Sequence, residues 1–144
     1  MCAIYSHEDR FQQHRFKADQ SFQLNTDLSP VAQYLDVPGI VDICVKNNVD
    51  AVHPGYGFLS ENAKFAAALS EAGITFIGPT VENLNVLGDK TQARQLAERV
   101  GVSLVPGSDG TVASVREAKE YISTIGYPVI VKAAMGGGGK QCYS

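Results

Sequence analysis

The stretch VDAVHPGYGFLSENAKFAAALSEAGITFI, residues 49–77, decides the fold class. Residues 49–53 are suited to a buried strand, which Pro54-Gly55 ends. An alanine-rich segment over residues 62–72 predicts a helix that stops at Gly73. Residues 74–77 have the apolar and β-branched composition of a second strand. A strand, a helix and a strand in this order predict a βαβ unit with parallel strands.

The alternation of strands and helices extends on both sides of this unit. Further strands are predicted at residues 2–6, 21–24, 102–105 and 128–134. Further helices are predicted from Pro38 onward and at about residues 81–87, 89–100 and 114–125. The whole pattern predicts an α/β chain with a parallel, Rossmann-like sheet. Residues 106–110, PGSDG, have the most linker-like composition, so we expect one domain over residues 1–105 and the start of a second, incomplete one over residues 106–144.

Composition excludes several classes of function. The chain has 144 residues, 12 basic and 15 acidic side chains and a net charge of −3, which argues against a nucleic-acid partner. No apolar run approaches the roughly 18–20 residues that a membrane helix needs. Cys2, Cys44 and Cys142 are widely spaced, which favours neither a disulfide framework nor a zinc site. We therefore expect an intracellular, reducing location, with the choice between mitochondrion and cytoplasm left open.

Residues 128–140, PVIVKAAMGGGGK, are the strongest candidate for a binding site. Lys132 lies in an apolar strand, where a lysine is costly to bury without an anionic partner. Gly136, Gly137, Gly138 and Gly139 follow, and successive glycines let backbone N–H groups point at phosphate oxygens. We favour a phosphate site. The alternative is an edge-strand lysine with its ammonium in water, followed by a flexible hairpin loop.

Lys90 is a second candidate for phosphate binding. It follows Gly88-Asp89 at the start of a predicted helix, where N–H groups attract anions. The alternative is a solvated charge in the first turn.

Two other glycine patterns are weaker. The turn at residues 55–60 resembles a dinucleotide fingerprint, but Ser60 replaces its third glycine and no acidic residue follows near Thr75. A tight turn is favoured there over the site of a nicotinamide-dependent oxidoreductase. Gly139-Lys140 is not a P-loop, because Gln141 follows the lysine and Ala134 occupies the place of the first glycine.

A set of short motifs then indicates a family. They are HPGYGFLSEN at residues 53–62, FIGP at 76–79, GDK at 88–90, VPG at 105–107 and VKAAMGGGGK at 131–140. Through them the chain closely resembles the amino-terminal part of the biotin carboxylase domain of biotin-dependent carboxylases, over about residues 2–140. It is most similar to the branch that carboxylates pyruvate. The acyl-CoA branch is the alternative, since Lys140 is common there.

The resemblance implies a pre-ATP-grasp domain followed by the start of an ATP-grasp lid. In such enzymes ATP and bicarbonate give carboxyphosphate, with Mg²⁺ as cofactor, and the carbon dioxide passes to biotin on a carrier domain. The pyruvate branch then transfers the carboxyl group to pyruvate, which gives oxaloacetate for gluconeogenesis, and its complete proteins are homo-oligomers. Lys90 and Lys132 match the family's ATP-phosphate lysines, and Gly136–Gly139 match its glycine-rich lid.

The chain also departs from the family pattern. The family begins with an earlier strand and an Asn-Arg-Gly-Glu-Ile-Ala turn, and continues Gly-Met-Arg where this chain has Gln141-Cys142-Tyr143. The resemblance therefore implies a fragment that is truncated at both ends. No catalytic residue or metal ligand is assignable within it, and we expect the isolated chain to be inactive. A non-catalytic nucleotide-binding or interaction fragment is the alternative of another class.

Overall fold

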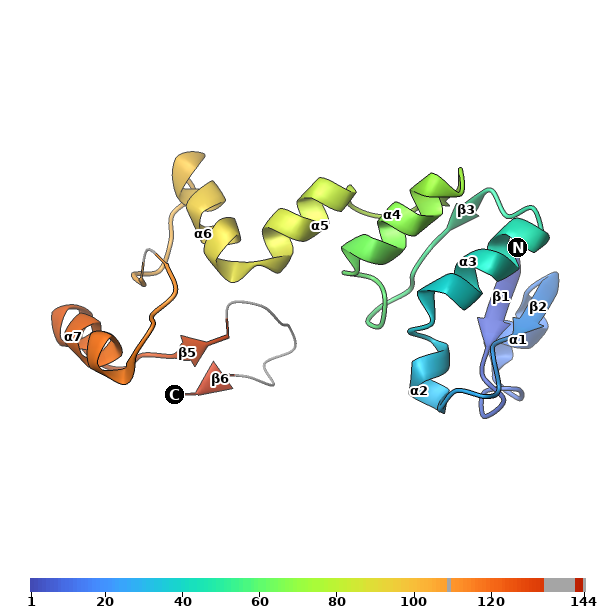
Figure 1. Ribbon diagram of the computed structural model, residues 1–144, viewed down its shortest axis with the longest axis horizontal. Helices are drawn as coiled ribbons and strands as arrows, with labels where there is room; N and C mark the ends of the chain where they lie inside the picture. Colours follow the sequence, from blue (N-terminus) through green and yellow to red (C-terminus); the bar gives the residue numbers. More distant parts are fainter. Residues whose placement is uncertain (109, 134–141, 144) are drawn as a thin grey trace. The chain divides into compact units, whose positions relative to one another are not determined.

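The computed structural model describes residues 1–108, 110–133 and 142–143. The chain divides into two compact units, Met1–Val81 and Glu82–Ser144. Figure 1 shows the elements in chain order. This division by compactness is distinct from the domain boundary predicted at residues 105/106, which stays a prediction.

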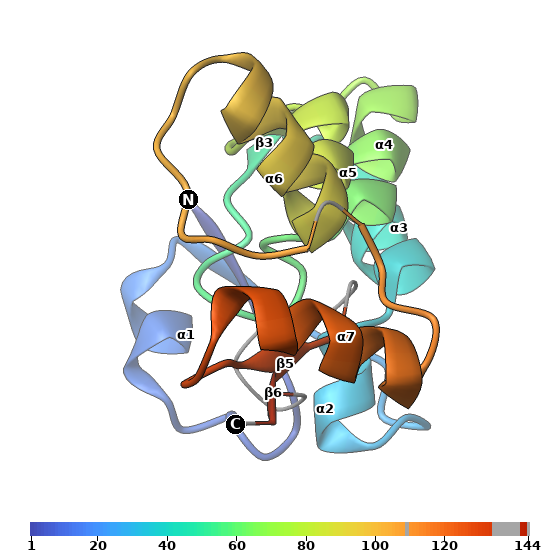
Figure 2. The same cartoon turned by 90° about the vertical axis from the view of Figure 1, so that its left-hand side faces the viewer.

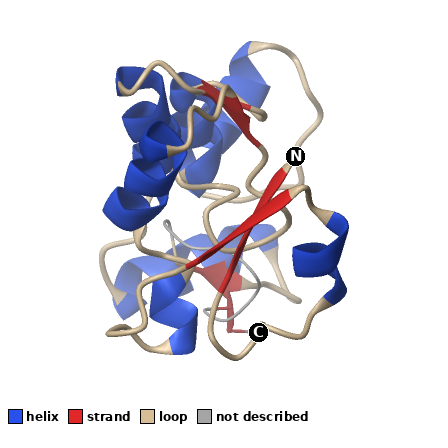
Figure 3. Cartoon of the chain, turned by 90° about the vertical axis from the view of Figure 1, so that its right-hand side faces the viewer, coloured by secondary structure: helices blue, strands red, loops and turns tan. Residues whose placement is uncertain are grey.

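The first unit has eight elements. They are β1 (Cys2–Tyr5), α1 (Gln13–Lys17), β2 (Gln20–Gln23), α2 (Pro30–Gln33), α3 (Val37–Lys46), β3 (Ala51–Val52), α4 (Ala63–Glu71) and β4 (Thr75–Phe76). Strands β1 and β2 pair in parallel, with Cys2 opposite Gln20 (Figure 3). Strands β3 and β4 also pair in parallel, with Ala51 opposite Thr75. The predicted α/β class and the parallel pairing are confirmed, but the strands of this unit form two separate pairs.

The apolar faces of α3 and α4 supply much of the core of this unit. The buried cluster consists of Leu24, Ile40, Cys44, Leu59, Phe65, Leu69 and Ile74. Phe65 packs edge-on against Phe76, with ring centroids 6.0 Å apart and planes at 86°. Complete burial of a Phe or Leu side chain contributes about 1.5–3 kcal/mol. Burial also raises the pKa of the Cys44 thiol, which keeps it protonated, as expected for a cysteine in the core.

Polar side chains begin the two core helices. Asp36 caps α3 by accepting from the Gly39 N–H at 3.2 Å, and Pro38 lies in the first turn as predicted. Asn62 caps α4 by accepting from the Phe65 N–H at 2.9 Å. Gly73 follows α4 with a φ of 73°, which explains the glycine at that stop.

The second unit holds α5 (Val81–Gly88), which begins at its boundary, α6 (Lys90–Arg99), α7 (Val115–Ile125), β5 (Val131–Lys132) and β6 (Cys142–Tyr143). Strands β5 and β6 lie side by side and antiparallel, with Lys132 opposite Cys142 (Figure 2). Ser114 caps α7 by accepting from the Glu117 N–H, and Glu117 accepts in turn from the Ala113 N–H. Ser114 and Glu117 have the spacing of a capping box, although the carboxylate reaches the residue before the cap.

Two strand predictions in this unit need correction. Residues 102–105 form no strand, and the Val105 carbonyl accepts a hydrogen bond from the Arg94 side chain instead. The strand predicted at residues 128–134 is only Val131–Lys132 among the described residues, and it pairs antiparallel with a strand that the sequence did not indicate. Across the described part of the chain, none of the helices combines the length and the apolar character needed to cross a membrane.

Candidate functional site

Lys90 is the first residue of α6 and is half-buried. The preceding residue, Asp89, caps the helix by accepting from the N–H groups of Thr91 at 2.8 Å and Gln92 at 3.2 Å. The Gln92 N–H is the main cause that lowers the pKa of the Asp89 carboxyl below its ordinary value. Because the carboxylate occupies these amides, the ammonium of Lys90, rather than the end of the helix, is the group suited to an anion.

Lys132 lies on β5, and both residues of that strand are exposed. Lys132 is therefore not buried, so burial does not argue for an anionic partner, and in this respect the structure agrees with the alternative of an edge-strand lysine. Its role in phosphate binding stays a prediction. Gly136–Gly139 lie outside the described residues, as does Lys140. The strands that flank this segment in sequence pair with each other. Lys90 and Lys132 belong to the same unit but to different elements.

Two side chains hold the connection between α6 and α7. Arg94 donates from Nη1 to the Val105 carbonyl at 2.8 Å and from Nη2 to the Gly107 carbonyl at 3.3 Å. Tyr121, on α7, donates to the same Gly107 carbonyl at 2.7 Å. The segment with linker-like composition is thus fixed by both helices at its start. Sequence reasoning missed this arrangement, because neither side chain lies in a glycine or lysine motif.

The glycine turn of the first unit has an unusual backbone. Gly55 and Gly57 have φ values of 72° and 83°, and Phe58 has a φ of 43°, which is uncommon for a residue with a side chain. The Gly55 N–H donates to His53 Nδ1 at 3.0 Å, which leaves Nε2 as the protonated nitrogen of a neutral ring. The Phe58 ring stacks on Tyr34 at 5.2 Å between centroids. The segment forms the tight turn that the sequence favoured.

Tyr34 links this turn to the end of β1. Its hydroxyl accepts from the Ser6 N–H at 3.0 Å and donates to Asp9 Oδ2 at 2.5 Å. The Ser6 hydroxyl donates to the same carboxylate at 3.2 Å. Burial, and then the bond to Asp9, raise the pKa of the Tyr34 hydroxyl. No local sequence pattern indicates this cluster, because Tyr34 and Asp9 are separated by 25 positions.

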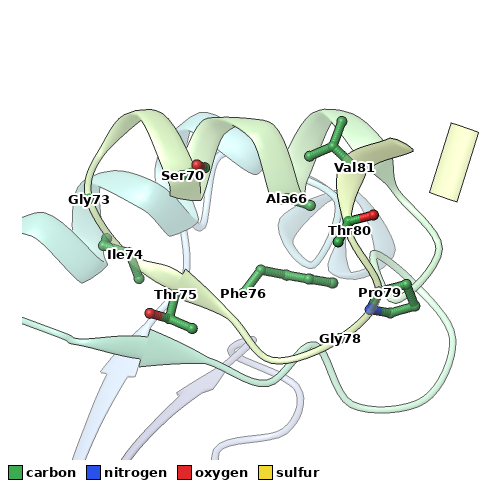
Figure 4. Close-up of a pocket in the computed structure, with 10 residues that line it drawn as sticks. All are labelled: Ala66, Ser70, Gly73, Ile74, Thr75, Phe76, Gly78, Pro79, Thr80 and Val81. Carbon is green, nitrogen blue, oxygen red and sulfur yellow. The ribbon is translucent and has the colours of Figure 1, made fainter. Parts of the chain in front are cut away.

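A pocket of about 480 Å³ opens beside β4 and α4 in the first unit. Figure 4 shows Phe76 between Ala66 and the turn at Gly78 and Pro79, with the hydroxyl groups of Ser70, Thr75 and Thr80 at its wall. The sequence did not predict this pocket. Its lining is about equally polar and apolar, and it brings together none of the predicted site residues.

The described residues can also be tested as a site for Mg²⁺. Among them, no group of three or more His, Cys, Asp or Glu side chains is arranged to hold a metal ion. They therefore do not fit Mg²⁺, and no chemical step is assigned to the metal here.

Two family models match the chain. Residues 1–84 match "Biotin carboxylase, N-terminal domain", and residues 89–142 match "Carbamoyl-phosphate synthase L chain, ATP binding domain". Among curated proteins, the mitochondrial pyruvate carboxylase of Homo sapiens is 51% identical over 138 residues, and the pyruvate carboxylase of Bacillus subtilis is 48% identical over 138 residues. Each match covers 96% of this chain. The chain spans 12% of the length of these relatives.

Solved structures agree with these matches. The biotin carboxylase domain dimer of the 2-oxoglutarate carboxylase of Hydrogenobacter thermophilus, in complex with MgADP, ADP and bicarbonate, has a TM-score of 0.93 and 42% identity. That match covers 99% of this chain and 31% of the other. The pyruvate carboxylase of Rhizobium etli has a TM-score of 0.88 and 41% identity, over 99% of this chain and 13% of the other.

Proposed function

The chain belongs to the biotin carboxylase family, whose amino-terminal domain it matches over residues 1–84, and from that membership we propose that it is the nucleotide-binding amino-terminal part of a pyruvate carboxylase. The proposed reaction of the complete protein is a ligation. ATP and bicarbonate carboxylate biotin, and the carboxyl group then passes to pyruvate, which gives oxaloacetate. The observation that carries this proposal is the identity of 48–51% to pyruvate carboxylases of human, Bacillus subtilis and fission yeast over 96% of the chain.

The proposed roles of this chain's residues are to bind and orient the phosphates. Lys90 and Lys132 contact phosphate oxygens and balance their charge during transfer, and the N–H groups of Gly136–Gly139 close over them. Two observations support these roles. Asp89 fixes the backbone beside Lys90 with two hydrogen bonds, and Lys132 is exposed and therefore accessible to a ligand.

The proposed partners follow from the same membership. They are ATP, bicarbonate, a biotin carrier domain and further copies of the complete protein. The relative from Hydrogenobacter thermophilus is described as a dimer with nucleotide and bicarbonate. We propose an intracellular location. The relatives include a mitochondrial human protein and a bacterial one, so the compartment depends on the source of the chain.

The lysine roles are tested by Lys90→Gln and Lys132→Gln in the complete carboxylase that contains this chain. Loss of a charge-assisted contact costs about 1.5–3 kcal/mol, so the KM for ATP should rise by about 10- to 150-fold. The measurement is bicarbonate-dependent release of phosphate from ATP. Lys119→Gln, at an exposed position of α7, is the matched control. Unchanged ATP kinetics in both lysine variants would refute the assignment.

The 144-residue chain alone tests the alternative of a non-catalytic fragment. It covers 31% of the biotin carboxylase domain from Hydrogenobacter thermophilus, so we expect weak ATP binding without turnover. Purified chain is incubated with ATP, bicarbonate and free biotin, and phosphate release is followed. Bicarbonate-dependent release that disappears in Lys132→Gln would show that these residues suffice. The alternative acceptor is an acyl-CoA. Carboxylation of acetyl- or propionyl-CoA by the complete protein, in place of pyruvate, would favour it.

A further inference from the structure

The connection between α6 and α7 is held in a way that a simple linker does not need. The carbonyls of Val105 and Gly107 both accept from the Arg94 guanidinium, and the Gly107 carbonyl also accepts from the Tyr121 hydroxyl. Two donors from two helices therefore meet on one oxygen, which has two lone pairs to receive them. The segment connects α6 to α7 in the chain (Figure 1).

The geometry of this clamp is specific to its residue types. The guanidinium is a rigid planar fork that reaches two acceptors in a fixed geometry, whereas the donors of an ammonium group rotate about a flexible stem. A Cβ atom on Gly107 would lie 3.1 Å from Arg94 Nη1 and 3.3 Å from its Cζ, so the close approach of the guanidinium favours glycine there. Arg94, Gly107 and Tyr121 thus form one unit, which we call the carbonyl clamp.

The carbonyl clamp joins α6, which carries Lys90, to α7, the helix that precedes the Lys132 strand in the chain. Lys90 and Arg94 are four residues apart on α6, so they share a face of that helix. Tyr121 lies on α7, and the chain continues from α7 through Gly126 to β5 and Lys132. Both helices are thereby fixed to the same carbonyl.

We propose that Arg94 and Tyr121 are positioning residues, which hold the Lys90 helix and the segment leading to Lys132 in one arrangement for binding ATP phosphates. This inference rests on the proposed function. Neither side chain contacts the nucleotide. Their effect is to reduce the number of arrangements that α6 and α7 adopt before ATP binds, so that less ordering is needed on binding.

The test uses the 144-residue chain with three variants. Arg94→Lys keeps the positive charge but loses the fork, Tyr121→Phe loses only the hydroxyl, and the third variant combines both. The matched controls are Arg99→Lys, at an exposed position in the last turn of α6, and Tyr127→Phe, whose tyrosine is 82% exposed. Amide hydrogen exchange at residues 105, 107 and 108 reports the state of this segment, since Pro106 has no amide hydrogen. ATP affinity is measured by titration, with amide NMR shifts near Lys90 and Lys132 as the readout.

We expect Tyr121→Phe to speed exchange of these amides and to weaken ATP binding by about 2- to 10-fold, the range for one net hydrogen bond. The double variant should lose less affinity than the two single effects combined, because both donors act on one carbonyl. Lys90→Gln should weaken ATP binding without changing exchange at residues 105–108.

The outcomes separate this inference from the proposed function. Faster exchange with unchanged ATP affinity overturns the positioning role and leaves the proposed function standing. Unchanged exchange in both Arg94→Lys and Tyr121→Phe overturns the clamp itself. Unchanged ATP kinetics of Lys90→Gln and Lys132→Gln in the complete carboxylase would overturn the ATP assignment, and the positioning role with it. Equal effects of the control variants would show a general loss of structure and also contradict the inference.

Discussion

Gly78 shows how one missing side chain shapes the first unit. A Cβ atom at this position would lie 2.5 Å from Cε1 of Phe76. Phe76 is not free to move away, because its ring packs edge-on against the buried Phe65. We expect Gly78→Ala to destabilise the chain by about 1–3 kcal/mol, the usual cost of overpacking. Denaturant unfolding measures this, with Gly88→Ala as the control because its Cβ would meet open space. Equal midpoints for the two variants would contradict the packing argument.

Tyr34 gives a prediction about pH. Burial, and secondarily Asp9, raise the pKa of its hydroxyl above the ordinary value of 10.0. The folded chain therefore holds this proton more tightly than the unfolded chain does. The contribution to stability is complete below pH 10.0 and is lost as the pH rises through the folded pKa. We expect Tyr34→Phe to reduce the loss of unfolding free energy at alkaline pH.

Urea unfolding of the unaltered chain and of Tyr34→Phe, at a series of pH values around 10.0, checks this prediction. Tyr127→Phe is the control, since its ring is 82% exposed. The alkaline slope should become shallower only in Tyr34→Phe. The same slope in all three proteins would mean that the Tyr34 proton is not linked to folding.

At the scale of elements, the cap of α4 has the clearest consequence. Asn62 satisfies the Phe65 N–H, and the same helix buries Phe65 and Leu69 in the core. Loss of an N-cap costs about 0.5–2 kcal/mol, so Asn62→Ala should lower the free energy of unfolding by that amount. Asn62→Asp should retain most of the unfolding free energy of the unaltered chain, because a carboxylate is an equally good cap. The control is Asn85→Ala inside α5, where alanine is the better helix former. Equal stability of Asn62→Ala and the unaltered chain would show that the cap is not needed.

Helices were more predictable than strands because their ends are marked locally. Single residues mark the helix ends. Asp89 and Ser114 cap the starts of α6 and α7, and Gly101 follows the end of α6. Residues 102–105 have strand-like composition, but no partner strand pairs with them and Arg94 takes the Val105 carbonyl. Helix α2 was missed because its four residues are too few to show a periodicity.

In the candidate site too, features that are marked locally in the sequence were predictable, and features that join distant residues were not. Lys90 could be placed at a helix start from Gly88-Asp89-Lys90 alone, and α6 begins there. The sequence left open whether Lys132 is buried or exposed, because exposure depends on how β5 pairs, and its partner β6 carries no sequence signal. The Tyr34 cluster and the carbonyl clamp join residues that are distant in sequence, so only the folded chain reveals them.

At the scale of the whole chain, the buried hydrophobic residues are distributed unevenly. Among the described residues, Leu84 is the only buried hydrophobic residue that lies beyond the first unit. The described helices α6 and α7 have no buried residue, whereas α4 has Phe65, Ala66 and Leu69. Local stability follows the number of buried apolar contacts. The two units should therefore open with different free energies, and α6 and α7 should open more readily than α4.

Native-state hydrogen exchange tests this difference directly. After correction for intrinsic rates, amides of α6 and α7 should exchange at least about 10-fold faster than those of α4, which corresponds to about 1.4 kcal/mol in opening free energy. Saturating ATP should slow exchange in the second unit only, because ligand binding stabilises the state that binds. Leu69→Ala supplies the converse control, since it removes a fully buried side chain and should speed exchange of α4. Uniform protection across α4, α6 and α7 would mean that the chain opens as one cooperative body, and the uneven core would then not govern its stability.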